Sequence, residues 1–261
     1  MIQPLPILKH GVSVAEVGNW QRFLNLVGMT DQTGQPLLVD EDFGAKTMVA
    51  TQAYQNARGI ALPDGGGWLD PLTRKQALTE GFIPFVQAKN AYVSFPNVKV
   101  TRRLIVIHTM ENPEGPYQAE NVALWFAGRA NSPAPEASAH FCVDEDSVVQ
   151  CVRETDGAWH AGPVNGYSIG IEHNGYANQT TMQWDDAPSR AILARSAKLA
   201  AGIAKRFGIP IEHVSGRGLA TAKGFCGHVD VTNALTGGKG HQDPGQAFPW
   251  EDYLGMVTDA L

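Results

Sequence analysis

The stretch "LIVIH", from Leu104 to His108, is the most informative run for the fold of this chain. Four consecutive apolar residues without polar alternation predict a short strand that is buried on both faces, as in a sheet covered by helices. The run ends at His108, and ligand sites in such sheets lie just outside the ends of the strands. His108 is therefore either a site residue or simply the end of a strand, and the run alone leaves both interpretations open.

The residues that follow supply the other elements of a mixed domain. Residues 138–153 ("SAHFCVDEDSVVQCVR") have the pattern of two short strands around an acidic turn, and residues 167–175 ("YSIGIEHNG") alternate as a strand does. A long helix is predicted from Asp186 to Phe207, ended by Gly208 and Pro210. We therefore expect an α/β (α+β) domain over residues 99–261, with a mixed central sheet flanked by helices.

The residues that precede the run have the pattern of three short helices. Ser13 and Glu16 predict a capping box at the start of the first helix, and apolar residues then repeat at helical spacing. A second helix is predicted over residues 43–57, and a third begins where Asp70 caps and Pro71 takes the first helical position. We expect a small three-helix domain at residues 1–80 and a linker at residues 81–98.

Motifs in the three-helix segment resemble the peptidoglycan-binding domain found on many cell-wall hydrolases. The resemblance is carried by "LNLVG" at residues 24–28, "DFG" at residues 42–44, and the residues Thr47, Gln52 and Gln55. The run "DEDFG" departs from the usual "VDGxFG" of that family. The resemblance implies that this domain binds the glycan or the stem peptide of the cell wall.

Composition and charge limit the classes of molecule that this protein is expected to bind. The 261 residues carry a formal charge of −6, which argues against nucleic acid or an anionic membrane surface as the main partner. No apolar run approaches the ~20 residues of a membrane span, and the first residues lack the pattern of a secretory signal. We expect synthesis in the cytoplasm without a signal peptide and without membrane insertion. No heptad repeat or long exposed apolar stripe suggests self-association, so a monomer is expected.

The three cysteines do not form a disulfide framework. Cys142 and Cys151 flank the predicted hairpin and either meet in a disulfide or remain two buried thiols. Two buried thiols are the favoured interpretation.

The histidines raise the question of a metal site. His228 lies in "CGHVD", and His241 precedes Asp243 in the glycine- and proline-rich loop "GKGHQDPGQAFPW". Imidazole beside carboxylate suits a borderline metal ion such as zinc. However, His108 is far from His228 and His241 in the sequence, and no local zinc signature is present. Spacing alone therefore does not favour a metal site.

Six motifs change this interpretation. The runs "RRLIVIHTM", "SAHFCVDEDSVVQ", "AWHAG", "YSIGIEHNG", "CGHVDV" and "HQDPGQAFPW" occur in the same order as in the zinc-dependent N-acetylmuramoyl-L-alanine amidases of the type-2 family. The resemblance covers roughly residues 95–261. It implies that His108, His228 and Asp243 bind zinc, which leaves one tetrahedral position for water, as a catalytic zinc requires.

The resemblance also implies catalytic roles for two further residues. Glu172 matches the catalytic glutamate, which acts as general base on the attacking water and returns the proton to the leaving amine; otherwise it is a solvent-facing strand end. His241 stands where many members of the family have lysine, and an N–H there would stabilise the oxyanion. Asp230 is the rival ligand to Asp243, although a turn role or support of His228 is favoured. Lys239 is a lesser candidate for the missing cation.

The remaining candidates belong to the cleft or to the structure around it. Trp159 and His160 of "AWHAG" are expected to bind substrate, with Trp159 packing beneath His160. His140 is expected to be structural, and His173 to point to the opposite face of its strand from Glu172. His10 and His213 are expected on the surface.

The sequence therefore predicts a zinc amidase that cleaves the amide between the lactyl group of N-acetylmuramic acid and L-alanine in bacterial peptidoglycan. A wall-binding domain joined to an amidase resembles a phage endolysin that acts in the periplasm or cell wall. The alternatives are a non-catalytic peptidoglycan-recognition protein, a secreted antibacterial effector or autolysin with the same activity, and a metallohydrolase with peptidase specificity.

Overall fold

The apolar run that begins at Leu104 forms β2 (Leu104–Thr109), an interior strand of a five-stranded sheet. All six residues of β2 are buried. The computed structural model of the protein describes residues 5–92, 101–128 and 133–261. The chain divides into two units, Met1–Phe85 and Val86–Leu261, and the sheet belongs to the second.

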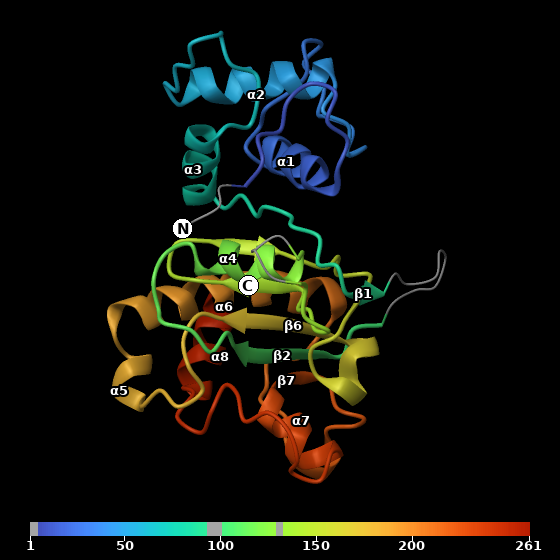
Figure 1. Ribbon diagram of the computed structural model, residues 1–261, viewed down its shortest axis with the longest axis vertical. Helices are drawn as coiled ribbons and strands as arrows, with labels where there is room; N and C mark the ends of the chain where they lie inside the picture. The colour runs from blue at the N-terminus through green and yellow to red at the C-terminus, as the bar shows by residue number, and fades with distance from the viewer. Residues whose placement is uncertain (1–4, 93–100, 129–132) are drawn as a thin grey trace. The chain divides into compact units, whose positions relative to one another are not determined.

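The sheet of the second unit is mixed, as expected from the sequence. Its strand order is β4-β3-β6-β2-β7. The strands β2, β3 (Phe141–Val143), β6 (Ser168–His173) and β7 (Gly224–Gly227) run parallel, whereas β4 (Val148–Gln150) is antiparallel to β3. The parallel strands β2 and β6 place His108 directly opposite Glu172. Figure 1 shows these strands side by side.

Two long helices cover one face of the sheet. The helix α6 (Ala187–Phe207) packs against β6 and β3, and α8 (Trp250–Asp259) packs against α6 (Figure 1). Asp186 caps α6 by accepting the N–H of Ser189, and Gly208 ends it with a left-handed φ of 63°. Tyr253 of α8 contacts the rings of Phe225 and His173, so the side chain of His173 faces these helices.

The opposite face of the sheet carries the elements that surround the site. Leu104, Val106 and Cys226 form an apolar cluster with Val164 and Val231. The last two belong to the 3-10 helix η1 (Gly162–Tyr167) and to α7 (His228–Leu235). The helix α4 (Gln118–Phe126) packs against β3 and β4. His108 and Glu172 continue the alternation of this face at the strand ends.

Shorter elements complete the second unit: β1 (Ala91–Tyr92), β5 (Gly157–Ala158), α5 (Thr181–Trp184) and η2 (Gly216–Gly218). The strands β1 and β5 pair with each other, and the N–H groups of Val86 and Ala88 donate to Gln150 and Cys151. The segment expected as a linker, residues 81–98, therefore joins the second unit from Val86 onward. Its residues 93–98 lie outside the described residues.

The first unit contains the three expected helices, α1 (Ala15–Leu26), α2 (Ala45–Ala57) and α3 (Pro71–Thr79). Trp20, Phe23, Tyr54 and Phe82 form an aromatic core in which ring centroids lie 5.1–5.6 Å apart. Phe43, expected within the second helix, precedes it and is fully buried.

The start of α3 agrees with the sequence prediction, whereas the start of α1 does not. Asp70 accepts the N–H groups of Leu72 and Thr73, as a capping residue does. At α1 the N-cap is Val14, without a side-chain hydrogen bond, and the Ser13 hydroxyl donates to the carbonyl of Glu41 instead. The expected capping box is wrong: the helix begins one residue later than predicted, so Ser13 is not the N-cap, and the Glu16 carboxylate forms a buried ion pair with Arg74.

Two further observations concern membranes and thiols. Within the described part of the chain, the helices are all too short or too polar to cross a membrane. Cys142 and Cys151 are buried free thiols whose Sγ atoms lie 3.7 Å apart, in line with the favoured interpretation.

Candidate functional site

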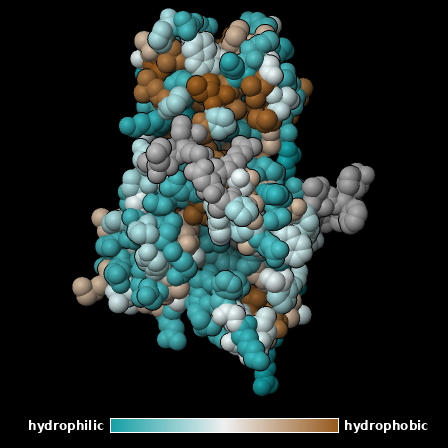
Figure 2. Space-filling model, viewed as in Figure 1, coloured by the Kyte–Doolittle hydropathy of each residue, from teal (hydrophilic) through white to brown (hydrophobic). Residues whose placement is uncertain are grey.

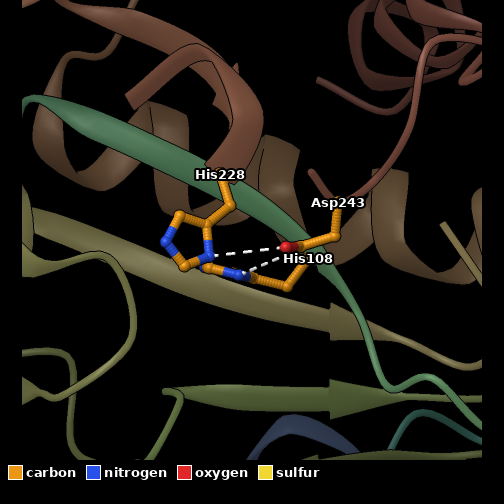
Figure 3. Close-up of side chains that lie close together, drawn as sticks. All are labelled: His108, His228 and Asp243. Carbon is orange, nitrogen blue, oxygen red and sulfur yellow. Dashed lines mark hydrogen bonds and ion pairs between the residues drawn. The ribbon is translucent and has the colours of Figure 1, made fainter. Parts of the chain in front are cut away.

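Three residues from distant parts of the sequence converge at the ends of the strands. His108 comes from β2, His228 is the first residue of α7, and Asp243 comes from the loop that precedes α8. One ligand atom from each lies within 4.8 Å of the others. Figure 3 shows both imidazoles directed at the Asp243 carboxylate, with His108 Nδ1 2.9 Å from Oδ2 and His228 Nδ1 3.5 Å from Oδ1.

The local structure explains this convergence. The strand β7 pairs with β2 and ends at Gly227, so His228 begins α7 beside the end of β2. The N–H of Val229 donates to the carbonyl of Asp243 at 2.8 Å, which ties the loop to the first turn of α7. A Cβ at position 227 would lie 2.6 Å from Pro244 Cδ. Glycine at this position therefore lets the loop approach closely enough to deliver Asp243.

The three donors fit a metal ion of the zinc type. Two imidazole nitrogens and one carboxylate oxygen are a common catalytic donor set, and tetrahedral ligands at bond lengths of about 2.0–2.2 Å lie roughly 3.3 Å apart. His108 Nδ1 lies 2.9 Å from Asp243 Oδ2 and His228 Nδ1 lies 3.5 Å from Oδ1, and one ligand atom from each of the three residues lies within 4.8 Å of the others. His108 and Asp243 are buried and His228 is partly buried. These residues can therefore hold a metal while leaving one position open toward the pocket.

The protonation states suit metal binding. Burial lowers the pKa of His108, although the hydrogen bond with Asp243 opposes this change. Burial would raise the pKa of Asp243, but hydrogen bonds with His108 and His228 outweigh it and hold that pKa far below its usual range. A neutral imidazole and an ionised carboxylate are the forms that bind metals.

Glu172 lies next to the three-residue cluster. It pairs in register with His108 and lines the same pocket. Burial raises the pKa of Glu172 well above its usual range, and the negative charges of Asp243 and Glu111 raise it further. A carboxyl group with a raised pKa accepts a proton more readily at neutral pH.

Glu111 is a site residue that the sequence did not reveal. Its carboxylate accepts hydrogen bonds from Thr109 Oγ1 at 2.6 Å and from the N–H of Ala177 at 2.8 Å. It adopts a left-handed φ of 54°, which is uncommon for a residue other than glycine. Its position two residues after the end of β2 was the available signal, because its effect on Glu172 depends on the tertiary structure.

His241 lies at the rim of the site. Its side chain is 74% exposed, and its ring stacks on that of His228 with centroids 4.5 Å apart. Its Nδ1 atom is 3.7 Å from Asp243 Oδ1. The structure thus brings His241 to the same cluster as the other predicted residues. Lys239 also lines the pocket.

The pair Trp159 and His160 differs from the expectation. Trp159 is 51% exposed and packs against the ring of Tyr92 rather than beneath His160. His160 Nδ1 lies 3.0 Å from His108 Nε2, and His160 Nε2 lies 3.0 Å from the hydroxyl of Ser168. Both residues line the pocket, but the two ring nitrogens of His160 are already occupied by protein groups. Ser168 is another residue that the sequence did not single out.

The other histidines and Asp230 have structural surroundings. His140 is buried between the N–H of Gly170 and the carbonyl of Asp156, and His173 bonds to the backbone carbonyl of His108. His10 and His213 are exposed, as expected. The Asp230 carboxylate accepts the N–H of Gly227 and pairs with His213. It therefore fixes the start of α7, which is the favoured turn role, and it is not part of the metal-ligand cluster.

A pocket of about 770 Å³ opens over the cluster. Besides the residues above, its lining includes Met110, Asn112, Trp125 and Glu136. This volume lies within the range of small-molecule and cofactor sites, and the lining combines aromatic rings with a few polar groups. The arrangement suits hydrolysis of a substrate bound beside a metal and a base.

Comparisons with known proteins point to one family. A family model described as "Amidase_2: N-acetylmuramoyl-L-alanine amidase" matches residues 98–246, a span that includes every residue of the three-donor cluster. N-acetylmuramoyl-L-alanine amidase A of Achromobacter lyticus is 34% identical over 159 residues, which are 59% of this chain and 82% of that protein.

A solved structure agrees at the level of the fold. The crystal structure of Staphylococcus aureus hydrolase AmiA in complex with its ligand aligns with a TM-score of 0.51 and 19% sequence identity. The alignment covers 68% of this chain and 81% of that one. At this identity the likeness bears on the fold alone.

Proposed function

The chain belongs to the type-2 N-acetylmuramoyl-L-alanine amidase family, and from that premise we propose that it cleaves peptidoglycan with a zinc ion held by His108, His228 and Asp243. The bond is the amide between the lactyl group of N-acetylmuramic acid and L-alanine. The observation that carries the zinc proposal is the convergence of two imidazoles on one buried carboxylate, with one ligand atom from each residue within 4.8 Å of the others (Figure 3). Zinc, when bound, supplies a Lewis acid that polarises the amide carbonyl and makes water a stronger nucleophile.

Glu172 is the proposed proton carrier. Its raised pKa and its place in register with His108 support this role. The carboxylate takes a proton from the attacking water and then donates it to the nitrogen of the departing L-alanine. The same group thus serves as base in the first step and as acid in the second.

His241 and Trp159 are proposed to act on the substrate. An N–H of His241, at the rim beside Asp243, can donate to the developing oxyanion. The exposed face of Trp159 offers an apolar surface for the sugar or the lactyl group. His160, whose nitrogens are engaged, is left out of direct substrate recognition.

The first unit is proposed to hold the enzyme on the polymeric wall. The resemblance of residues 10–80 to peptidoglycan-binding domains supports this role. Leu26, Leu38 and Leu72 are exposed in this unit, and Figure 2 shows apolar residues gathered over it. Exposed apolar surface of this kind often marks a binding site. A wall-binding unit joined to an amidase resembles a phage endolysin that acts in the periplasm or cell wall.

Metal content tests the proposal. We expect about one zinc ion per purified chain by elemental analysis, and a loss of both zinc and amidase activity in His228→Ala. His10→Ala is the matched control, because His10 is an exposed histidine of the first unit and its loss leaves the zinc content unchanged. An active wild-type chain without bound metal would contradict the proposed zinc dependence.

A further inference from the structure

A line of hydrogen bonds runs away from the metal-ligand cluster into the protein. His108 Nε2 lies 3.0 Å from His160 Nδ1, and His160 Nε2 lies 3.0 Å from Ser168 Oγ. The Ser168 hydroxyl in turn donates to the backbone carbonyl of Val164 at 2.8 Å. Ser168 is fully buried.

The number of available protons determines which atom donates in each hydrogen bond of this line. The carbonyl of Val164 can only accept, so the single hydroxyl proton of Ser168 is committed to it. The bond between Ser168 and His160 therefore requires that His160 Nε2 donates. A neutral His160 then offers a lone pair at Nδ1, and His108 Nε2–H must donate to it. A charged His160 would place a positive charge, in addition to that of the proposed zinc ion, beside His108.

The consequence reaches the metal site. The contact between His108 Nδ1 and Asp243 Oδ2 at 2.9 Å is a hydrogen bond only when Nδ1 carries a proton. When the proton of a neutral His108 is held at Nε2, a lone pair at Nδ1 faces Oδ2 instead. Two acceptors at this distance need a cation to bind them both. The line thus selects the tautomer of His108 in which Nδ1 can bind a metal.

The His160 ring is also held independently of His108. A Cβ at Gly170 would lie 2.7 Å from ring atoms of His160, so the ring rests directly on the backbone of β6. The side chain of Asn165 accepts the N–H groups of His160 and Ala161 at 3.1 and 2.7 Å. The ring is therefore a fixed support rather than a group that adapts to its neighbours.

We propose that His160 and Ser168 are positioning residues that hold the His108 imidazole in the tautomer and orientation required for zinc binding. This inference rests on the proposed function, because it concerns the same zinc site. It gives His160 a role different from the substrate contact expected from the sequence. His160 acts on the reaction only through His108.

Zinc affinity tests the proposal directly. The full chain is stripped with a chelator, and the dissociation constant for zinc is measured by competition with a chromophoric chelator. His160→Ala should weaken zinc binding by about 10–100-fold, the usual effect of losing a group that supports a metal ligand. Ser168→Ala should weaken it by about tenfold, although Ser168 touches neither metal nor ligand. His160→Gln should recover part of the affinity, since its side-chain oxygen can accept from His108.

Kinetic measurements distinguish a positioning role of His160 from a contact with substrate. A matched serine variant distinguishes the role of Ser168 from a general effect on protein stability. At saturating zinc, His160→Ala should lower kcat more than it raises KM for a soluble muropeptide. Ser196→Ala is the control, because Ser196 is another buried serine, bonded to Tyr253 and carried by α6 on the face of the sheet opposite the pocket. The zinc affinity of this variant should match that of the wild type.

The outcomes distinguish failure of the proposed zinc amidase function from failure of the proposed positioning role. A wild-type chain that binds no zinc overturns both the proposed function and this inference. A wild type that binds zinc, with unchanged affinity in His160→Ala and Ser168→Ala and a raised KM in the former, overturns the inference alone. Equal loss of zinc affinity in Ser196→Ala also overturns it, because the effect would then follow from general destabilisation.

Discussion

Burial shifts the pKa values of His140 and Glu172 in opposite directions. Burial lowers the pKa of His140 to about 3 and raises the pKa of Glu172, because in each case the charged form loses water. His140 uses both ring nitrogens structurally, accepting from the N–H of Gly170 and meeting the carbonyl of Asp156. Its neutral form is therefore part of the folded structure.

The lowered pKa of His140 predicts that the folded second unit loses stability in acid. In the unfolded chain a histidine takes up a proton near pH 6.5, whereas folded His140 does so only near pH 3. Its stabilising contribution is thus complete above pH 6.5 and is lost as the pH falls toward 3, at up to about 1.4 kcal/mol per pH unit. Urea unfolding of the full chain between pH 7 and pH 4 measures the total slope, to which other buried histidines such as His173, whose pKa burial lowers to about 4, also contribute.

The matched variants are His140→Gln and His10→Gln. His140→Gln should reduce the slope by about one proton, whatever its effect on absolute stability, while exposed His10→Gln should leave the slope unchanged. An identical slope in wild type and His140→Gln would show that the folded protein protonates His140 normally.

At this scale the sequence predicted residue types better than residue partners. His108, His228, Asp243 and Glu172 were selected by the resemblance of six ordered motifs to the family, since residue type and spacing alone did not favour a metal site. Ser168 was not selected, since its role depends on the register of β6 and on the ring of His160. Such partners are set by tertiary packing, which periodicity and spacing do not describe.

At the scale of elements, helix starts show where local rules hold and where long-range contacts prevail. Asp70 caps α3 as the sequence predicted: its Oδ1 accepts the N–H groups of Leu72 and Thr73, while its Oδ2 serves Thr73 Oγ1 and, at 3.5 Å, Gln55 Nε2. The capping box expected at Ser13 does not form, since α1 has Val14 as its N-cap and Glu16 pairs with Arg74 of α3. β2 was predicted from an apolar run, β6 from alternation, and β3 and β4 from a hairpin pattern. The sequence did not reveal β7, which contains two glycines, and β1 and β5, two residues each, were too short to leave a pattern.

This difference gives a paired prediction. Asp70→Ala should destabilise the first unit by about 1–2 kcal/mol, because three hydrogen bonds at the start of α3 are lost. Ser13→Ala should change its stability by less than about 0.5 kcal/mol, since the exposed Ser13 caps no helix. Thermal unfolding of the two variants measures both values. Equal destabilisation by the two changes would contradict this assignment of the helix starts.

At the scale of the whole molecule, the chain joins two units with separate cores. The family membership concerns the second unit, since the matched span begins at residue 98. The proposed binding role of the first unit rests on its motifs and exposed apolar residues. Tethering to the wall would raise the local concentration of substrate for the second unit.

Separate expression of the units tests this division of labour. Residues 1–85 should pellet with insoluble peptidoglycan and remain soluble with cellulose, the control polysaccharide. Residues 86–261 should cleave a soluble muropeptide but pellet weakly, because they lack the proposed binding unit. If residues 1–85 stayed in solution with peptidoglycan, the binding role would have to be abandoned.

The most direct measurement of the central claim is mass spectrometry of purified peptidoglycan digested by the full chain. We compare the wild type, the chelator-treated wild type and Glu172→Gln, which keeps the size of the side chain but removes the base. The account predicts free stem peptides that begin at L-alanine, absent after chelation and reduced at least about 100-fold in Glu172→Gln. Cleavage inside the stem peptide with the lactyl amide intact, or full activity in either control, would contradict it.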